Sequence, residues 1–190
     1  MDMGVNAERE LRELKETRVS SETVFDGTVL HVRKDTVSLP NGQRANREVI
    51  RHVGAVCVIP VTEDGRVIVE RQYRYPIAQV ITEIPAGKLD SPEEDRLSAI
   101  ERELREETGY TAEEWISLGD FYPAPAYSDE HISMYMARGL RPGNRHLDAD
   151  EFLDVMSVPL QDLVEDVMAG RIRDAKTQTA VLKAARMLGV

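Results

Sequence analysis

Hydrophobic and polar positions follow a strand-like alternation over much of this chain. From residue 18 to residue 51 two strands are expected at 28–39 and 45–52, joined by a tight turn at PNGQ. Residues 53–61, VGAVCVIPV, form an unbroken apolar run that is typical of a central strand buried on both faces. A strand at 67–75 is expected in the same sheet, and further strands at 79–85, 115–123, 131–140 and 152–160.

Helical periodicity appears at three places between and after these strands. Helices are expected at 92–108, 160–168 and 174–188, with a short helical arm at 7–16. Strands and helices interleaved in this order predict the α/β class, as an α/β/α sandwich around a mixed sheet.

The chain is expected to divide near residue 50. Its first strands have little apolar bulk, so they are expected to extend a neighbouring sheet or to pack on a partner subunit. We therefore predict an N-terminal arm with an antiparallel β extension at residues 1–50. The main domain is then expected at residues 51–190.

The helix at 92–108 has clear end signals. Ser91 is expected as its N-cap with Pro92 at the first position, and Glu94 completes a capping box. Leu97, Ile100 and Leu104 recur at helical spacing, and Gly109 stands where a left-handed residue ends a helix. These signals predict the bounds of the helix.

Three acids stand at the unfavourable end of this helix. Glu103, Glu106 and Glu107 occupy its last turns, where the helix dipole favours cations. Glu103 and Glu107 share a face at the edge of the apolar stripe, and Arg102 is placed to pair with Glu106. Such a cluster is typical of a site for a hard divalent cation, although surface helices rich in glutamate are also common.

Composition narrows the classes of partner. The 190 residues are 42% hydrophobic, which suffices for a sizeable core, and the net charge is −10. This charge disfavours binding to nucleic acid or to an anionic membrane surface. No apolar stretch approaches the roughly 20 residues that span a bilayer. The single cysteine, Cys57, lies in an apolar run and is expected to be buried and unreactive. A cytoplasmic protein is expected.

The stretch from residue 87 to residue 110 closely resembles the Nudix box. The matching positions are Gly87, Glu94, Arg102, Glu103, Leu104, Glu106, Glu107, Gly109 and Tyr110. Six residues separate Gly87 from Glu94 where the family pattern has five, but the extra residue precedes the catalytic part of the box. The resemblance implies the Nudix fold, which agrees with the predicted sandwich.

The same resemblance implies a metal-dependent hydrolase. It implies Mg²⁺, with Mn²⁺ as a possible substitute, bound by Glu103, Glu106, Glu107 and the backbone carbonyl of Ala86. It also places Arg102 and Glu106 among the catalytic residues. Bound ions would neutralise a diphosphate and supply a hydroxide nucleophile.

Segments outside the box resemble the ADP-ribose pyrophosphatase branch of the family. They are REVIRH, VERQYR, TEIPAGKLD and PAPAYSDE, together with Pro125, sixteen residues after Gly109. This branch splits ADP-ribose into AMP and ribose 5-phosphate. The resemblance implies Glu130 as the catalytic base, with Asp129 left open for that role, and Arg74 as a contact of the diphosphate.

Further substrate contacts are expected from the N-terminal strands. Arg47 and Glu48 are candidates for an adenine or ribose pocket, Phe25 for stacking on the base, and Glu83 for contacting substrate or supporting Arg102. The resemblance implies a homodimer whose N-terminal strands cross between subunits. Other ADP-sugars, NADH or GDP-mannose are alternative substrates, and a non-catalytic ADP-ribose sensor is the alternative of a different class.

Overall fold

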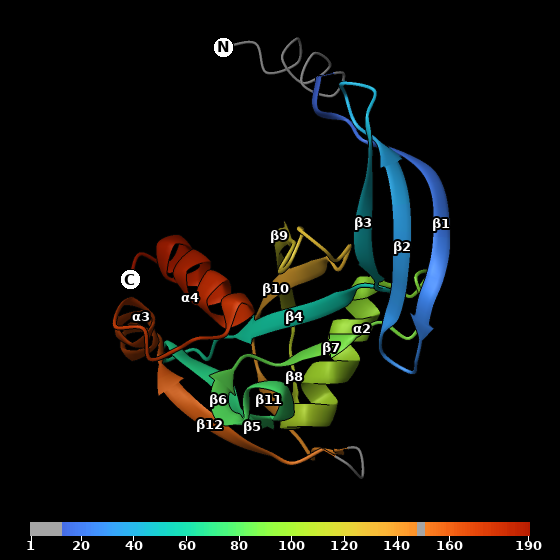
Figure 1. Ribbon diagram of the computed structural model, residues 1–190. Helices are drawn as coiled ribbons and strands as arrows, with labels where there is room; N and C mark the ends of the chain where they lie inside the picture. The colour runs from blue at the N-terminus through green and yellow to red at the C-terminus, as the bar shows by residue number, and fades with distance from the viewer. Residues whose placement is uncertain (1–12, 148–150) are drawn as a thin grey trace. The chain divides into compact units, whose positions relative to one another are not determined.

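Figure 1 shows the computed structural model, which describes residues 13–147 and 151–190. The described residues form two compact units, one running to His52 and including Ala124–Glu130, the other comprising Val53–Pro123 and His131–Val190. The helical arm expected at 7–16 lies mostly outside the described residues. No helix in the described part of the chain has the length and apolar character needed to cross a bilayer.

The first unit contains a three-stranded antiparallel sheet in the order β1-β2-β3. Its strands are β1 (Thr17–Asp26), β2 (His31–Ser38) and β3 (Arg44–Arg51). The predicted turn between β2 and β3 is present, with Gly42 at a φ of +82°. Every residue of the outer strand β1 is exposed.

The second unit contains two main sheets. A mixed sheet has the order β7-β4-β10-β9, in which β4 and β10 are parallel, and an antiparallel sheet has the order β12-β5-β6. The strands are β4 (Ala55–Pro60), β5 (Arg66–Arg74), β6 (Gln79–Glu83), β7 (Ala86–Lys88), β9 (Glu114–Phe121), β10 (Ile132–Arg138) and β12 (Leu153–Pro159). Short strands β8 (Tyr110–Thr111) and β11 (Arg141–Pro142) pair with each other, and η1 (Tyr75–Ile77) is a 3₁₀ turn.

One prediction about sheet membership was wrong. The strand at 67–75 was expected beside 53–61, but β5 belongs to the second sheet. A single bridge between Val61 and Val67 connects the two segments in the described residues. A strand pattern identifies the faces of β5 but not its neighbours, because pairing depends on segments far away in sequence.

Helices cover both faces of the mixed sheet, as Figure 1 shows. They are α2 (Arg96–Glu103), α3 (Leu160–Met168) and α4 (Ala175–Leu188). Val56 and Val58 of β4 belong to a buried cluster with Ile100 of α2, whereas Cys57 and Ile59 belong to a cluster that includes residues of α3 and α4. This alternation confirms the α/β/α sandwich and the central strand buried on both faces. Cys57 is buried and free, as expected.

Candidate active site

The acid-bearing helix begins later than the sequence predicted. Its N-cap is Asp95, whose side chain accepts a hydrogen bond from the Ser98 N–H at 2.8 Å. Glu94, expected to close a capping box with Ser91, instead accepts from the Asp90 N–H at 2.6 Å. The predicted start at Pro92 was therefore wrong. Asp95, four residues after Ser91, is a second residue of a type that caps helices, and it is the N-cap in the structure.

The end of the helix agrees with the prediction and adds one feature. Gly109 ends it at a φ of +77°, and a side chain there would meet the Gly143 carbonyl oxygen at 2.8 Å. The last turn, η2 (Leu104–Thr108), is π-helical, a distortion that is frequent at functional sites. The apolar stripe is shorter than predicted, because Leu97 is exposed.

Glu103 and Glu107 both contact strand β7. Glu107 is only 5% exposed and accepts a hydrogen bond from the Ala86 N–H at 3.2 Å. Glu103 packs directly over Gly87, where an added Cβ would lie 2.1 Å from the Glu103 Cδ. The acids were expected at the edge of the protein body; Glu107 is instead buried against β7.

Arg102 is the cation closest to these acids along the helix. Its Nη1 lies 2.8 Å from Glu103 Oε1 and 3.3 Å from Glu106 Oε2, which confirms the predicted pairing with Glu106. Its Nη2 lies 3.3 Å from Glu94 Oε1. Partial burial acts to lower the pKa of Arg102, but the neighbouring carboxylates raise it above its ordinary value. Asp90 Oδ2 also lies 3.9 Å from the Arg102 Nη2, so one guanidinium is shared among four carboxylates.

Two further buried acids lie opposite each other in the second sheet. Glu70 of β5 pairs in register with Glu83 of β6, and they are 2% and 1% exposed. Like charges in directly opposed positions destabilise an antiparallel pair. Sequence analysis missed Glu70, although an acid directly after the apolar residues 67–69 was an available signal.

These buried carboxylates fit a divalent cation. Burial raises the pKa of Glu107, and the charges of Glu70 and Glu103 raise it further. Burial also raises the pKa of Glu70, and its Oε2 has no hydrogen-bond partner among the described residues. A cation would stabilise the ionised forms. No three acidic, histidine or cysteine side chains in the described ranges converge as a finished metal site.

A further acid comes from the segment before β12. The charge of Glu151 contributes, as a smaller cause than burial, to the raised pKa of Glu70, Glu103 and Glu107. We call Glu70, Glu103, Glu107 and Glu151 the carboxylate cluster. Sequence analysis missed Glu151 because it ends the acidic run DADE, which resembles an ordinary solvated loop. A cavity of about 370 Å³ opens beside it, lined in part by Arg71.

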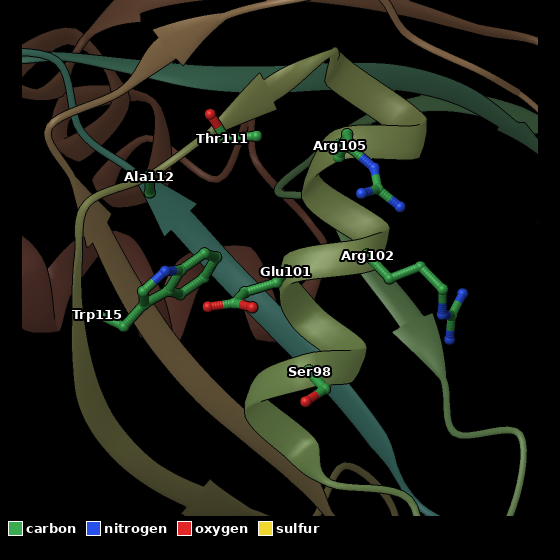
Figure 2. Close-up of a pocket in the computed structure, with 7 residues that line it drawn as sticks. All are labelled: Ser98, Glu101, Arg102, Arg105, Thr111, Ala112 and Trp115. Carbon is green, nitrogen blue, oxygen red and sulfur yellow. The ribbon is translucent and has the colours of Figure 1, made fainter.

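Another cavity, of about 310 Å³, lies between α2 and Trp115. Figure 2 shows Glu101 turned toward Trp115, whereas the guanidinium of Arg102 extends away from it. No member of the carboxylate cluster lines this cavity. Glu101 is therefore an acid of the same helix that lies outside the cluster.

Arg74 is held by Glu83 in a two-point ion pair. The Arg74 Nε and Nη2 atoms donate to the two Glu83 oxygens at 2.6 and 2.8 Å. Burial alone would raise the pKa of Glu83, but the Arg74 hydrogen bonds and the charge of Lys176 outweigh it and lower this pKa. The expectation that Glu83 supports Arg102 was wrong, since the side-chain partners of Glu83 are Arg74 and Lys176.

The candidates from the N-terminal strands lie in the first unit. Arg47 of β3 pairs with Glu16, with its Nε 2.9 Å from Glu16 Oε2. Glu48 of the same strand is exposed, and Phe25 of β1 is 55% exposed. Their roles in substrate binding stay predictions.

The two loop acids differ in their contacts. Asp129 accepts hydrogen bonds from the Arg51 guanidinium at 2.9 Å and from the His52 N–H at 2.8 Å, so both of its oxygens are engaged within the first unit. The Glu130 Oε1 lies 4.0 Å from the His52 Nε2. Of these two acids, Asp129 is thus more firmly engaged in holding the loop.

The close contact between Gly87 and Glu103 leads to a prediction about substitution of the glycine. Because a Cβ at this position overlaps Glu103, Gly87→Ala should displace that carboxylate and lower kcat about 100-fold, the loss typical of a misplaced catalytic group. Steady-state kinetics of the variant would measure this. Wild-type activity of Gly87→Ala would contradict the contact.

Two family models match the chain. The model described as NUDIX domain matches residues 51–178, and the model described as nucleoside diphosphate sugar hydrolase N-terminal domain matches residues 16–50. Together they cover nearly all of the described residues.

Relatives and a solved structure agree with these matches. The ADP-ribose pyrophosphatase of Bacillus subtilis (strain 168) is 40% identical over 90% of this chain and 93% of its own. The methanol dehydrogenase activator of Bacillus methanolicus is 41% identical over 88% and 91%. A crystal structure of an ADP compounds hydrolase superposes with a TM-score of 0.82 at 26% identity, over 92% of this chain and 95% of that one.

Proposed function

The chain belongs to the Nudix hydrolase family, and on this premise we propose that it hydrolyses the diphosphate bond of a nucleoside diphosphate derivative. We propose ADP-ribose as the substrate, with AMP and ribose 5-phosphate as the products. The observation that supports this most is the carboxylate cluster, in which Glu107 and Glu103 contact β7 and burial raises the pKa of Glu70, Glu103 and Glu107. The names of the relatives favour an ADP-containing substrate.

Members of this family use a divalent metal ion, and for this chain we propose Mg²⁺, with Mn²⁺ as a substitute. Glu103, Glu106, Glu107 and the Ala86 carbonyl oxygen would hold it. When bound, such an ion neutralises diphosphate charge and lowers the pKa of a bound water. Arg102 contributes by holding Glu103 and Glu106 close together before metal binds.

The water that attacks the diphosphate needs a carboxylate outside the metal helix to orient it and to take its proton. The family resemblance implies Glu130 for this role. Glu151 is supported because it belongs to the same compact unit as the proposed metal ligands and its charge acts on Glu70, Glu103 and Glu107, whereas Glu130 belongs to the other unit. We propose Glu151 as the first candidate and keep Glu130 as the second.

Substrate binding is proposed to centre on Arg74. Its guanidinium suits a diphosphate oxygen pair, and Glu83 holds it in a fixed orientation. Arg47, Glu48 and Phe25 are proposed to contact the adenosine part. Other ADP-sugars, NADH and GDP-mannose carry the same diphosphate, so they remain alternative substrates.

A homodimer is proposed, with the N-terminal strands crossing between the subunits. The fully exposed strand β1 supports this, because it carries the exposed apolar side chains of Val19, Val24 and Phe25. A cytoplasmic location and the lack of nucleic acid or membrane partners are likewise proposals, and the net charge of −10 supports them.

A substrate panel tests the proposed function. ADP-ribose, an ADP-hexose, NADH and GDP-mannose would be assayed with Mg²⁺, with Mn²⁺ and with a chelator, and the products separated by chromatography. We expect the highest kcat/KM for ADP-ribose with Mg²⁺, products AMP and ribose 5-phosphate, and no turnover with the chelator. ADP-ribose binding without turnover under any metal would instead identify a sensor. Sedimentation of the same preparation measures the oligomeric state.

A further inference from the structure

A lysine from the last helix reaches the carboxylate that holds Arg74. Lys176 lies in the first turn of α4, 93 residues from Glu83 along the chain, and its side chain is only 11% exposed. The ammonium donates a hydrogen bond to Glu83 Oε2 and lies 3.1 Å from Asp174 Oδ1. Glu83 therefore lies between two cations, Arg74 and Lys176.

The start of α4 is fixed to the end of β6. Asp174 is the N-cap of α4, and its Oδ2 accepts hydrogen bonds from the Thr177 N–H at 2.9 Å and the Thr177 hydroxyl at 2.6 Å. The Thr177 hydroxyl oxygen accepts in turn from the Ile84 N–H at 2.9 Å. Because Ile84 follows Glu83 directly, this chain of bonds sets the position of Lys176 relative to the Glu83 carboxylate.

The charge balance explains why a second cation is needed there. Glu83 faces Glu70 across the strand pair, and both are buried. Burial raises the pKa of Glu70 to about 8, whereas Arg74 and Lys176 lower the pKa of Glu83, so Glu83 is the ionised member of the pair. The charge of Lys176 acts on both, lowering the pKa of each. Without Lys176, the buried Glu83 carboxylate would keep one of its two cations, Arg74, against the cost of its burial.

We propose that Lys176 is a positioning residue of the diphosphate site: it holds Glu83 in place, and Glu83 in turn keeps the Arg74 guanidinium aimed at the diphosphate. This inference rests on the proposed function, in which Arg74 contacts the substrate. It extends that function to a residue that acts through Glu83 and Arg74 without touching the substrate.

A double-mutant cycle between Lys176 and Arg74 tests this. Lys176→Met, Arg74→Ala and the double variant would be compared by kcat/KM for ADP-ribose and by calorimetric Kd for its α,β-methylene analogue. We expect Lys176→Met to lower kcat/KM about tenfold, mostly through KM, and to weaken analogue binding similarly, as for other outer-shell partners. In the Arg74→Ala background both effects should vanish, and Lys176→Arg should restore most of the loss.

Lys183→Met is the matched control, because Lys183 lies on the same helix but donates to the Leu118 carbonyl. If Lys176→Met does not fold, Lys176→Gln takes its place. An equal effect of the Lys176 substitution with and without Arg74, or none in either, would overturn the inference. If the wild-type protein does not hydrolyse ADP-ribose, the proposed function fails, while the analogue-binding cycle still decides the role of Lys176.

Discussion

Glu107→Gln is expected to lower metal-dependent turnover about 1,000-fold while the fold stays intact. Glu107 is a proposed metal ligand, and a divalent ion contributes several kcal/mol to the transition state, of which about 4 kcal/mol corresponds to that factor. The variant should also lose the rise in Tm that Mg²⁺ gives the wild-type protein. Steady-state kinetics and thermal unfolding with and without Mg²⁺ measure both effects.

The direction in which Glu107→Gln changes the Tm of the metal-free protein can also be predicted. Burial, with the charges of Glu70 and Glu103, raises the pKa of Glu107 to about 10, so at neutral pH the metal-free fold binds a proton at this carboxyl that the unfolded chain does not. This difference destabilises the metal-free fold, and a neutral glutamine removes it, so the metal-free Tm should be unchanged or higher. Glu101→Gln, on the same helix outside the carboxylate cluster, is the control and should keep wild-type activity. Normal Mg²⁺-dependent turnover by Glu107→Gln would refute the metal assignment.

Glu151→Gln is expected to lower kcat between about 100- and 10,000-fold, the range typical of a lost general base. The Mg²⁺-induced rise in Tm should remain, because the proposed ligands Glu103, Glu106 and Glu107 are unchanged. Kinetics and thermal unfolding of the same sample separate these two effects.

The matching variant Glu130→Gln decides between the two candidates for the base. If Glu151 is the base, Glu130→Gln should keep kcat near its wild-type value. A loss of kcat confined to Glu130→Gln would move the role to the loop acid that the sequence supplies. A rise in KM alone in either variant would exclude that residue as the base.

The local hydrophobic pattern predicted most of the helices and strands, but it did not predict how the strands pair into sheets. The apolar run at 53–61 predicted the buried strand β4, and both C-terminal helices begin within one residue of their predicted starts. The membership of β5 in a second sheet depends on its partners β6 and β12, which no local pattern encodes. The start of α2 was misjudged because Ser91 and Asp95 carry competing cap signals.

In the candidate site, contacts within one helix could be predicted from the sequence, whereas contacts between segments far apart in the sequence could not. Residues within one helix have spacings fixed by its geometry, so the pairing of Arg102 with Glu106 followed from sequence. Glu70, Glu151 and Lys176 join the site through tertiary packing, from β5, the segment before β12 and α4. Glu83 was identified as a candidate for contacting substrate or for supporting Arg102, and its side chain pairs instead with Arg74 and Lys176, which no local pattern indicates.

Diffraction from crystals grown with Mn²⁺ and α,β-methylene ADP-ribose tests the central claim most directly. The account predicts anomalous peaks coordinated by Glu103, Glu107 and the Ala86 carbonyl oxygen, with the diphosphate bound to the same ions and contacting Arg74. Anomalous density elsewhere, with the carboxylate cluster metal-free beside a bound analogue, would contradict it.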